Sequence, residues 1–294
     1  MFGQTQPGEW EGHMAVGLDA LDADQRQFVE AHVKGGRVVA DHSWGQTDTV
    51  VLEVVAGPCR VIVKAGGPSN GRIAREIRGH REWAAPWRAT GSAARMIAAD
   101  ERARVLITTY LEGQLVEGTP AQDDPGIYEQ AGRLSAVFHD QYATADPTWN
   151  ARLRDRTLRF LSMPHRIHPR IAEQVRQEVA GWPVGGATVV PTHGDWQPRN
   201  WLDDHGVLRV IDLGRADLRT PEEDFVRLGR QDFLRNPELE AAVVAGYGRD
   251  PRDPDMWRRT NVAEAVGTAA WAFNVRDEDF EALGHAHLGR LYPE

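Results

Sequence analysis

Three polar residues in the second half of the chain have the types and the spacing to move a phosphoryl group. Asp195 lies in the segment His-Gly-Asp-Trp-Gln-Pro-Arg-Asn, Asn200 ends that segment, and Asp212 follows in the apolar stretch Val-Ile-Asp-Leu-Gly. Phosphoryl transfer from a nucleotide needs one carboxylate near the acceptor hydroxyl, and oxygen ligands that hold Mg²⁺ against the phosphates. Asp195 can orient the hydroxyl and accept its proton, while Asn200 and Asp212 can supply the oxygen ligands.

Each of these residues, taken alone, also has a structural explanation. Asp195 and Asn200 are residue types that form hydrogen-bonded Asx-turns in loops. An acid at position 212, between Ile211 and Leu213, is costly to bury unless a partner or a metal compensates its charge. The combination of all three within one short stretch therefore favours the chemical interpretation.

The composition limits the classes of protein to consider. The chain has 294 residues, of which 41% are hydrophobic and 26% charged, enough for a globular protein with two lobes. The net charge of -9 disfavours nucleic-acid binding and suits solubility or a cationic ligand. No run approaches 18 apolar residues and the N-terminus does not resemble a signal peptide. We therefore expect a cytoplasmic protein without membrane spans, and no obligate protein partner is indicated.

The pattern of apolar residues predicts an α+β protein with two lobes. Segments rich in Val and Ile predict antiparallel strands, an amphipathic stretch predicts a helix over residues 71–88, and residues 1–20 look peripheral. After residue 112 apolar residues recur at steps of three and four, and a strand is expected at residues 208–212. We expect a β-rich lobe over residues 1–112 and a mainly helical lobe over residues 113–294. The predicted strands are 37–41, 49–55, 60–65 and 104–110, and the predicted later helices are 127–142, 171–179, 225–234, 237–247 and 255–273.

The motif His-Gly-Asp-x-x-x-x-Asn, followed by Ile-Asp-x-Gly, resembles the catalytic loop and metal-binding segment of aminoglycoside phosphotransferases. These enzymes are relatives of choline kinases and share the bilobal protein-kinase-like fold, and the order of elements agrees from about residue 35 to residue 290. The resemblance implies that Asp195 is the catalytic base and that Asn200 and Asp212 hold Mg²⁺. It also implies that His193 and Asp224 support the catalytic loop, and that ATP or GTP is the phosphate donor.

The nucleotide side of the predicted site lies in the first lobe. Lys64 ends the apolar strand Val-Ile-Val-Lys, where it can reach nucleotide phosphates, and Glu76 lies on the following helix. The Lys–Glu pair of kinase-like folds needs this arrangement. Without the downstream motif, a surface lysine and a solvated glutamate would be the simpler description. With it, the paired interpretation is favoured.

Two further segments are predicted to contact the nucleotide. The loop over residues 41–48 lacks Gly-x-Gly-x-x-Gly, but its backbone N–H groups and Ser43 can cap phosphate oxygens. A plain hairpin turn describes the same loop almost as well. Thr109 and Leu111 lie at the expected hinge between the lobes and should line the cleft for the base. Their side chains do not discriminate ATP from GTP.

The acceptor contacts are predicted from two positions where the sequence departs from the family pattern, and from acidic residues near the C-terminus. Arg199 stands where the family usually has Gly, and Trp196 follows the catalytic Asp, so both can reshape the acceptor pocket. In aminoglycoside kinases, acidic groups of the helical lobe bind ammonium groups. An acidic helix start without a binding role is the alternative interpretation of such residues here. The predicted acceptor contacts are Trp196, Arg199, Trp271, Asp277, Glu278 and Asp279.

These residues predict an enzyme that moves the γ-phosphate of a nucleoside triphosphate to a hydroxyl of a small molecule. The resemblance implies an antibiotic acceptor, either an aminoglycoside or another sugar-, nucleoside- or peptide-containing compound, and hence resistance by inactivation. A metabolite kinase with a choline-like or sugar-like acceptor is an alternative. A non-catalytic nucleotide-binding pseudokinase is another, although it would not need the full set of chemical residues. The sequence does not identify the acceptor, the hydroxyl, the preferred nucleotide or the oligomeric state.

Overall fold

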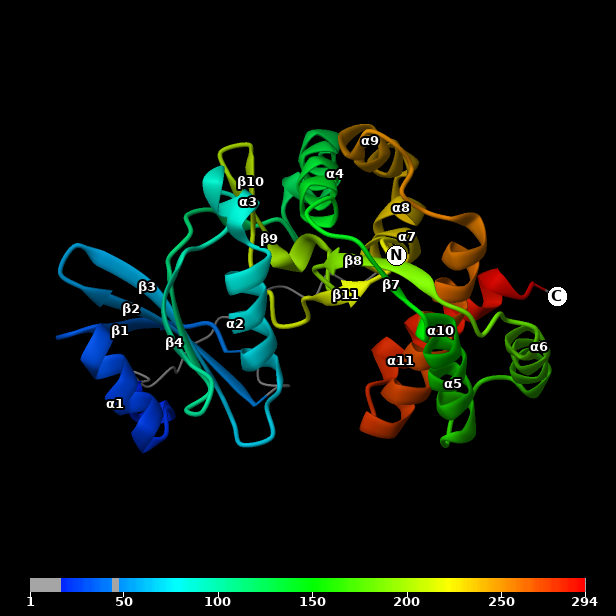
Figure 1. The fold of residues 1–294 in the computed structure, drawn as a ribbon, viewed down its shortest axis with the longest axis horizontal. Coiled ribbons are helices and arrows are strands. Elements are labelled where there is room, and N and C mark those ends of the chain that lie inside the picture. Colours follow the sequence, from blue (N-terminus) through cyan, green and yellow to red (C-terminus); the bar gives the residue numbers. More distant parts are fainter. Residues whose placement is uncertain (1–16, 44–47, 294) are drawn as a thin grey trace, which may run out of the picture.

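The computed structural model describes residues 17–43 and 48–293. Its first half is built on one antiparallel sheet, in the strand order β1-β2-β3-β5-β4, at one end of the molecule (Figure 1). The apolar side chains of β2 and β3 alternate, so that Val54, Val61 and Val63 pack against Val29 of the helix α1. The strands and helix are α1 (Ala23–His32), β1 (Arg37–Asp41), β2 (Thr49–Ala56), β3 (Cys59–Gly66), β4 (Met96–Asp100) and β5 (Val105–Thr109).

The opposite face of this sheet is covered by the helix α2 (Arg72–Glu82). Ile73 and Ile77, one helical turn apart, pack against Leu106 of β5. The four predicted strands are therefore present with nearly the expected bounds, but the edge strand β4 was not predicted. Its sequence Met-Ile-Ala-Ala-Asp has two alanines and little β-branched character, so it gives a weak strand signal.

The single helix predicted over residues 71–88 is wrong, because the structure breaks it into two. The helix α2 ends at Glu82, and a short helix α3 (Ala85–Ala89) follows with Pro86 in its first turn. Proline has no N–H to donate to the carbonyl of Glu82, and it disfavours the helical conformation of the residue before it. The break turns α3 away from the sheet. Trp87 of α3 then stacks on Phe138 with ring centroids 4.0 Å apart.

The second half of the chain is mainly helical, as predicted, and two small sheets interrupt it. The strands β6 (Gln114–Leu115), β9 (Trp201–Asp204) and β10 (Val207–Val210) form one sheet in the order β10-β9-β6. The strands β7 (Thr144–Asp146), β8 (Ala187–Thr192) and β11 (Asp217–Arg219) form the other, in the order β11-β8-β7. The helices are α4 (Pro125–His139), α5 (Trp149–Ser162), α6 (Pro169–Ala180), α7 (Glu222–Arg230), α8 (Asp232–Arg235), α9 (Pro237–Tyr247), α10 (Pro254–Val275) and α11 (Glu278–Leu291).

Several of these helices differ from the sequence-based expectation. The helix predicted over residues 225–234 is two helices, α7 and α8, which meet at Gln231. The helices α5 and α11 were not predicted. In α5 the apolar residues Trp149, Leu153 and Leu161 recur at helical spacing among arginines, so this helix had a usable signal that was missed. The sequence of α11 contains Gly284 and Gly289, which weaken its helix signal. No helix in the described ranges is long and apolar enough to cross a membrane.

The two small sheets bring the chemical motif together. The segment 193–200 leaves the end of β8, and residues 211–216 connect β10 to β11. Because β11 pairs with β8, with Asp217 opposite Thr192, the segment 193–200 starts beside the point where residues 211–216 end. The backbone N–H of Val210 also donates to the carbonyl of Ser92 at 2.7 Å, which joins the segment after α3 to this region. The predicted lobe boundary at residue 112 stays a prediction, and residues 83–93 pack with the helical half.

Trp87 is the side chain through which the first half joins the helical core. It is 1% exposed, and its Nε1 donates to the carbonyl of Leu134 at 2.9 Å. We expect Trp87→Ala to lower the free energy of unfolding by about 3–5 kcal/mol, because a large buried side chain leaves a cavity. Urea denaturation followed by circular dichroism measures this. The control Trp271→Ala, at a position 46% exposed, should cost less than about 1 kcal/mol. Equal losses in the two variants would contradict this packing role.

Candidate active site

The loop between β8 and β9 is held by a buried carboxylate from α7. Asp224 accepts the backbone N–H groups of His193 at 2.9 Å and of Gly194 at 2.6 Å. His193 closes the other side of the loop. Its Nδ1 accepts the N–H of Asp195 at 3.3 Å, so its Nε2 carries the proton and donates to the carbonyl of Ile211 at 3.0 Å. His193 and Asp224 therefore both contact the loop that they were predicted to support.

Gly194 is required at its position by geometry. Its φ is +75°, in the left-handed region that side chains rarely adopt. A Cβ on Gly194 would also lie 2.5 Å from the carbonyl oxygen of Arg215, which is shorter than any normal contact. The glycine of the His-Gly-Asp motif therefore allows residues 193–195 to approach the segment that carries Asp212.

Asp224 is itself part of a buried network that was not predicted. It lies 3.0 Å from the Nε2 of His139, and the Nδ1 of His139 lies 3.0 Å from the hydroxyl of Tyr247. Burial by itself raises the pKa of the Asp224 carboxyl. The hydrogen bond and the charge of His139 outweigh burial, so that the pKa is lowered. Asp224 therefore stays ionised and keeps both of its backbone donors.

Asp195 is a nearly enclosed carboxylate surrounded by positive charge. It is 3% exposed, and its Oδ1 accepts hydrogen bonds from Gln197 at 2.5 Å and Arg227 at 2.6 Å. Its Oδ2 accepts one from Arg199 at 2.8 Å, and the Nε of Arg215 lies 3.8 Å away. Burial by itself raises the pKa of Asp195, but Arg227, Arg215 and Arg199 hold it well below its usual range. Asp195 is therefore firmly ionised.

Asn200 and Asp212 lie next to each other and fit a magnesium ion. The N–H of Ile211 donates to the carbonyl of Asn200 at 3.0 Å, which places Asp212 one residue away. The side-chain nitrogen of Asn200 donates to the carbonyl of Asp195 at 2.7 Å, so its Oδ1 is left for a cation. Asp212 adopts a left-handed backbone with a φ of 65°, a conformation that often marks functional positions. These hard oxygen atoms are the ligands that Mg²⁺ prefers.

A metal ion held by Asn200 and Asp212 would take most of its ligands from phosphate oxygens and water. In residues 17–43 and 48–293 no group of three or more His, Cys, Asp or Glu side chains is placed to hold a metal ion. Magnesium commonly uses one or two protein ligands and completes its shell with phosphate oxygens and water. The pair Asn200 and Asp212 therefore fits a metal that arrives with a nucleotide better than a permanent all-protein site.

Lys64 joins the first-half sheet to this region. Its Nζ lies 2.7 Å from Oε1 of Glu76 on α2 and 3.7 Å from Oδ1 of Asp212. Burial lowers the pKa of Lys64, but the carboxylates of Glu76 and Asp212 outweigh this and raise it, so the lysine is charged. The structure thus brings together the Lys–Glu pair and the second motif. Their role toward a nucleotide stays a prediction.

The other predicted nucleotide contacts lie where strands of the first-half sheet end. Ser43 follows β1, and Thr109 and Leu111 lie at and after the end of β5. The Oγ of Ser43 accepts the N–H of Val51 at 2.9 Å, which fixes the start of the loop. Residues 44–47 of that loop lie outside the described residues. The N–H of Thr109 donates to the carbonyl of Arg95 at 2.9 Å, so this donor is not available to a base. Leu111 follows two residues after Thr109, where the chain leaves the sheet.

The comparison with protein families gives the assignment. The model of the phosphotransferase enzyme family (APH) matches residues 42–260, which include Lys64, Glu76, Asp195, Asn200 and Asp212. The chain belongs to this family. It is therefore a phosphotransferase of the kinase-like group, as the resemblance of its motifs implied. No curated protein sequence matches the chain.

Solved structures of phosphotransferases share the fold at low sequence identity. A thermostable mutant of aminoglycoside phosphotransferase APH(4)-Ia, in a ternary complex with ADP and hygromycin B, is 11% identical, with a TM-score of 0.68 and coverage of 90% of this chain and 96% of that one. Choline kinase LicA from Streptococcus pneumoniae is 12% identical, with a TM-score of 0.66 and coverage of 90% and 96%. Macrolide 2'-phosphotransferase MphH from Brachybacterium faecium is 16% identical, with a TM-score of 0.60 and coverage of 91% and 98%. The predicted protein-kinase-like α+β fold is confirmed.

Two of the predicted acceptor contacts have structural roles. Trp196 is 1% exposed and stacks on Trp87 at 5.6 Å, so it cannot present a face to an acceptor. The apolar side of the loop turns it into the core, where it fills volume beside Trp201. Asp277 is the N-cap of α11 and accepts the N–H of Phe280 at 3.0 Å. The burial of Trp196 corrects the expectation that it contacts the acceptor. The cap uses one carboxylate oxygen of Asp277, and acceptor binding by this residue stays a prediction.

The remaining acceptor predictions have different outcomes. Arg199 lies on the catalytic loop and contacts Asp195 directly. Trp271 is exposed on α10 and packs edge-on against Phe280. Glu278 and Asp279 are exposed in the first turn of α11, as in an acidic helix start. For these four residues, acceptor binding stays a prediction.

Sequence reasoning missed four charged or polar residues that contact the catalytic loop or its support. They are His139, Arg215, Arg227 and Glu264. Arg227 lies three residues after Asp224, hence on the same face of α7, and this spacing was a usable signal. His139 and Glu264 are separated from the motif by more than one element, so no local pattern points to them.

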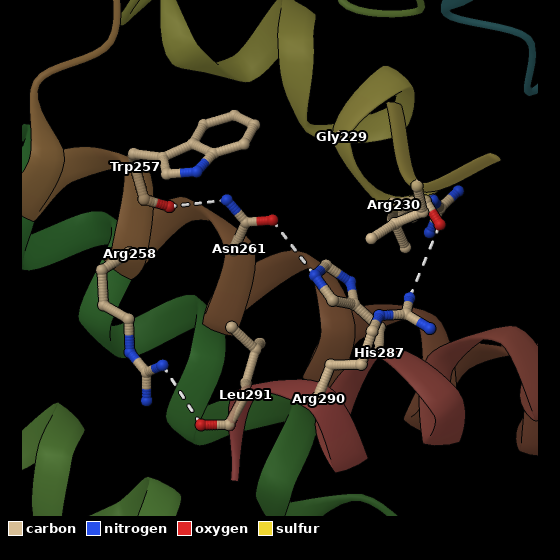
Figure 2. A pocket seen from close by; sticks show the side chains of 9 residues that line it. Gly229, Arg230, Trp257, Arg258, Asn261, His287, Arg290 and Leu291 are labelled. Atoms are coloured by element: carbon tan, nitrogen blue, oxygen red, sulfur yellow. Dashed lines mark hydrogen bonds between the residues drawn. The ribbon is translucent and has the colours of Figure 1, made fainter. Parts of the chain in front are cut away.

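A separate cavity of about 260 Å³ lies between α7, α10 and α11, as Figure 2 shows. Its wall includes Trp257, Arg290 and the hydrogen-bonded pair Asn261 and His287, whose atoms are 3.1 Å apart. None of Lys64, Asp195, Asn200 or Asp212 lines this cavity. The cavity is therefore separate from the residues that are predicted to carry the chemistry.

The variant Asp224→Asn tests the support of the loop. The amide can accept only one of the two N–H bonds and directs its own donor at the other, so we expect a loss of roughly 3 kcal/mol in the free energy of unfolding. Because the folded-state pKa of Asp224 is lowered, its contribution is present above its unfolded pKa of about 3.9. The stability difference between the two proteins should therefore shrink as the pH falls below that value.

Urea denaturation at neutral and acidic pH measures this difference. The control Asp279→Asn changes an exposed carboxylate in the first turn of α11 and should have a much smaller effect. If the difference in unfolding free energy between wild type and Asp224→Asn stays constant down to low pH, an ionised Asp224 is not what supports the loop.

Proposed function

We propose that the protein is a small-molecule O-phosphotransferase that moves the γ-phosphate of ATP or GTP to a hydroxyl group. The observation that carries this proposal is the approach of Lys64 to Asp212 within 3.7 Å. This contact joins the lysine of the first-half sheet to the motif that also contains Asp195 and Asn200. A phosphoryl donor and an acceptor hydroxyl have to meet at such a junction.

Lys64 and the pair Asn200 and Asp212 would hold the nucleotide. Lys64 is oriented by Glu76, so that its ammonium group can contact phosphate oxygens. Asn200 and Asp212 would hold Mg²⁺, which neutralises charge on the phosphates when bound. The similar APH(4)-Ia structure contains ADP, which supports an adenine nucleotide as one donor. Ser43 and the backbone near Leu111 would complete the phosphate and base contacts.

Asp195 would orient the acceptor hydroxyl. The hydroxyl oxygen attacks the γ-phosphorus, the bond to the β,γ-bridging oxygen breaks, and the hydroxyl proton ends on Asp195. The low pKa of Asp195 makes it a weak base, so proton transfer follows most of the bond formation. This fits a loose transition state, in which the main task of the carboxylate is to hold the hydroxyl in line. Transfer is direct and uses no phosphoenzyme.

The acceptor is proposed to be a small molecule, and antibiotics are the first class to test. The similar APH(4)-Ia structure contains hygromycin B, and another similar structure is a macrolide 2'-phosphotransferase. With such an acceptor, the biological role would be resistance by inactivation. A metabolite kinase is the second candidate. The arginines around Asp195 favour it over an aminoglycoside kinase, since they do not attract a polycation. The intact chemical set argues against a pseudokinase.

The variant Asp195→Asn tests the proposed base. We expect phosphotransfer to fall by about 10³-fold, because the amide cannot accept the hydroxyl proton. Turnover is measured with ATP and with GTP against a panel of antibiotics and metabolites, and products are identified by their mass. The control Asp155→Asn removes an exposed carboxylate on α5 and should leave turnover unchanged. Undiminished turnover in Asp195→Asn would exclude the assigned role.

The variant Arg227→Gln tests the electrostatics of Asp195 through the pH dependence of the rate. Arg227 helps to hold the pKa of Asp195 low, and its loss raises that pKa. Because the ionised form is active, the acid limb of the rate profile should move to higher pH. Nucleotide hydrolysis, with water as acceptor, is followed from about pH 3 to 7, a window that includes the usual pKa of an aspartate of about 3.9. Arg227→Lys keeps a charge and should restore much of the original profile. Identical acid limbs in wild type and Arg227→Gln would contradict the assignment.

A further inference from the structure

Five guanidinium groups lie on the catalytic loop, on the segment after Asp212 and on the helices α5 and α7, and they share three carboxylates as their ion-pair partners. Arg199, Arg215 and Arg227 surround Asp195 at 2.8, 3.8 and 2.6 Å. Arg227 and Arg230 each lie 3.6 Å from Glu264 of α10. Arg156 of α5 lies 3.5 Å from Glu223. The helix α10 packs against α5 and α11 (Figure 1), and it also contacts α7, which carries Arg227 and Arg230.

This local excess of positive charge contrasts with the net charge of -9 of the whole chain. Burial lowers the guanidinium pKa of both Arg215 and Arg230, and the charge of the neighbouring Arg227 lowers it further. The buried Nε of Arg230 has no hydrogen-bond partner among the described residues. When an acceptor hydroxyl contacts Asp195, that carboxylate becomes less available to its arginines. An anion would then compensate the excess charge.

Three of the arginines can reach a ligand. The side chains of Arg156, Arg199 and Arg215 keep 40%, 35% and 36% of their surface exposed. Arg227 and Arg230 are buried and strengthen the positive potential from within. Next to them, the ring of Phe280 lies 5.4 Å from Arg230 and packs against the exposed Trp271. The same region therefore offers both positive charge and an apolar surface for a carbon skeleton.

Four of the acidic residues that would suit a cationic acceptor are used in other ways or are weakened as ligands. Asp277 caps α11, and Glu281 pairs with Arg166 at 2.6 Å. Glu264 already lies between two arginines. Glu117 faces Arg199, but burial raises the pKa of its carboxyl despite that charge, which weakens it as an ammonium ligand. A polycation would therefore meet repulsion that these carboxylates do not offset.

We propose that the acceptor carries a carboxylate or phosphate close to the hydroxyl that is phosphorylated, and that Arg156 and Arg199 bind this group. The inference rests on the proposed phosphotransferase function and narrows its acceptor. Arg227 acts through Asp195 as a positioning residue and does not itself bind the acceptor.

The test compares two sets of hydroxyl compounds with the full chain, Mg²⁺ and γ-labelled ATP or GTP. The anionic set contains hydroxycarboxylates and sugar phosphates, and the cationic set contains aminoglycosides, amino sugars and choline. We expect transfer to members of the anionic set at rates at least about tenfold above any in the cationic set. Preferred transfer to the cationic set would overturn the acceptor proposal and leave the phosphotransferase function standing.

Transfer to neither set would also overturn the acceptor class. The proposed function is then judged separately, by whether Asp195→Asn abolishes hydrolysis of the nucleotide by water. Hydrolysis that does not respond to this substitution would count against the phosphotransferase function itself. The two failures are thus distinguishable within one set of assays.

The variant Arg156→Gln assigns the binding residue. We expect the KM for the best anionic acceptor to rise about tenfold or more, while kcat and the KM for the nucleotide change by less than about twofold. If Arg156 had only a structural role, its substitution would not raise the acceptor KM while leaving kcat and the nucleotide KM nearly unchanged. Arg156→Lys keeps the charge and should recover part of the affinity. The matched control Arg154→Gln, on the same helix beside Asp155, should leave all three constants unchanged. An unaltered acceptor KM in Arg156→Gln would exclude Arg156 from the site.

Discussion

Asp224 is the buried carboxylate on which the geometry of the catalytic loop depends. It accepts two consecutive backbone N–H groups, from His193 and Gly194, at the point where β8 ends. Without an acceptor these donors would be buried and unpaired, so the loop could not hold this conformation. Asp224 is in turn held by His139 and Tyr247, from α4 and α9. The helical half thus fixes the direction in which Asp195 points.

The charge around Asp195 follows from that fixed loop. Once the loop is held, Arg227 from the same helix as Asp224 reaches both Asp195 and the carbonyl of Gly194. A carboxylate that is so firmly ionised is suited to orienting a hydroxyl, and less suited to strong general-base catalysis. The same arginines make the surroundings of Asp195 positive. The support of the loop and the charge around Asp195 are therefore coupled through Asp224 and Arg227 of α7.

Two features join the two halves of the chain: the break between the helices α2 and α3, and the ion pair of Lys64 with Glu76. The break at Pro86 sends Trp87 into the helical core, so the first half is anchored there by apolar packing. The ion pair of Lys64 with Glu76, close to Asp212, brings the sheet to the catalytic motif on the other side. Burial of Trp196 between these contacts explains why the aromatic residue after Asp195 serves the core. The loop contributes its polar side to the site and its apolar side to the interior.

The sequence by itself determined the features that depend on neighbours along the chain. The spacing of Asp195, Asn200 and Asp212, the strands around Lys64 and the family that these motifs resemble were all readable, because hydrogen-bonded loops and alternating strands leave local patterns. Only the tertiary structure decided that Trp196 is buried and that Asp277 is a helix cap. It alone shows that His139 contacts Asp224 and that Glu264 lies beside Arg227. It also decided that arginines from separate helices converge on Asp195. Such contacts join residues that are distant in the chain, so the packing of helices determines them and no local pattern records them.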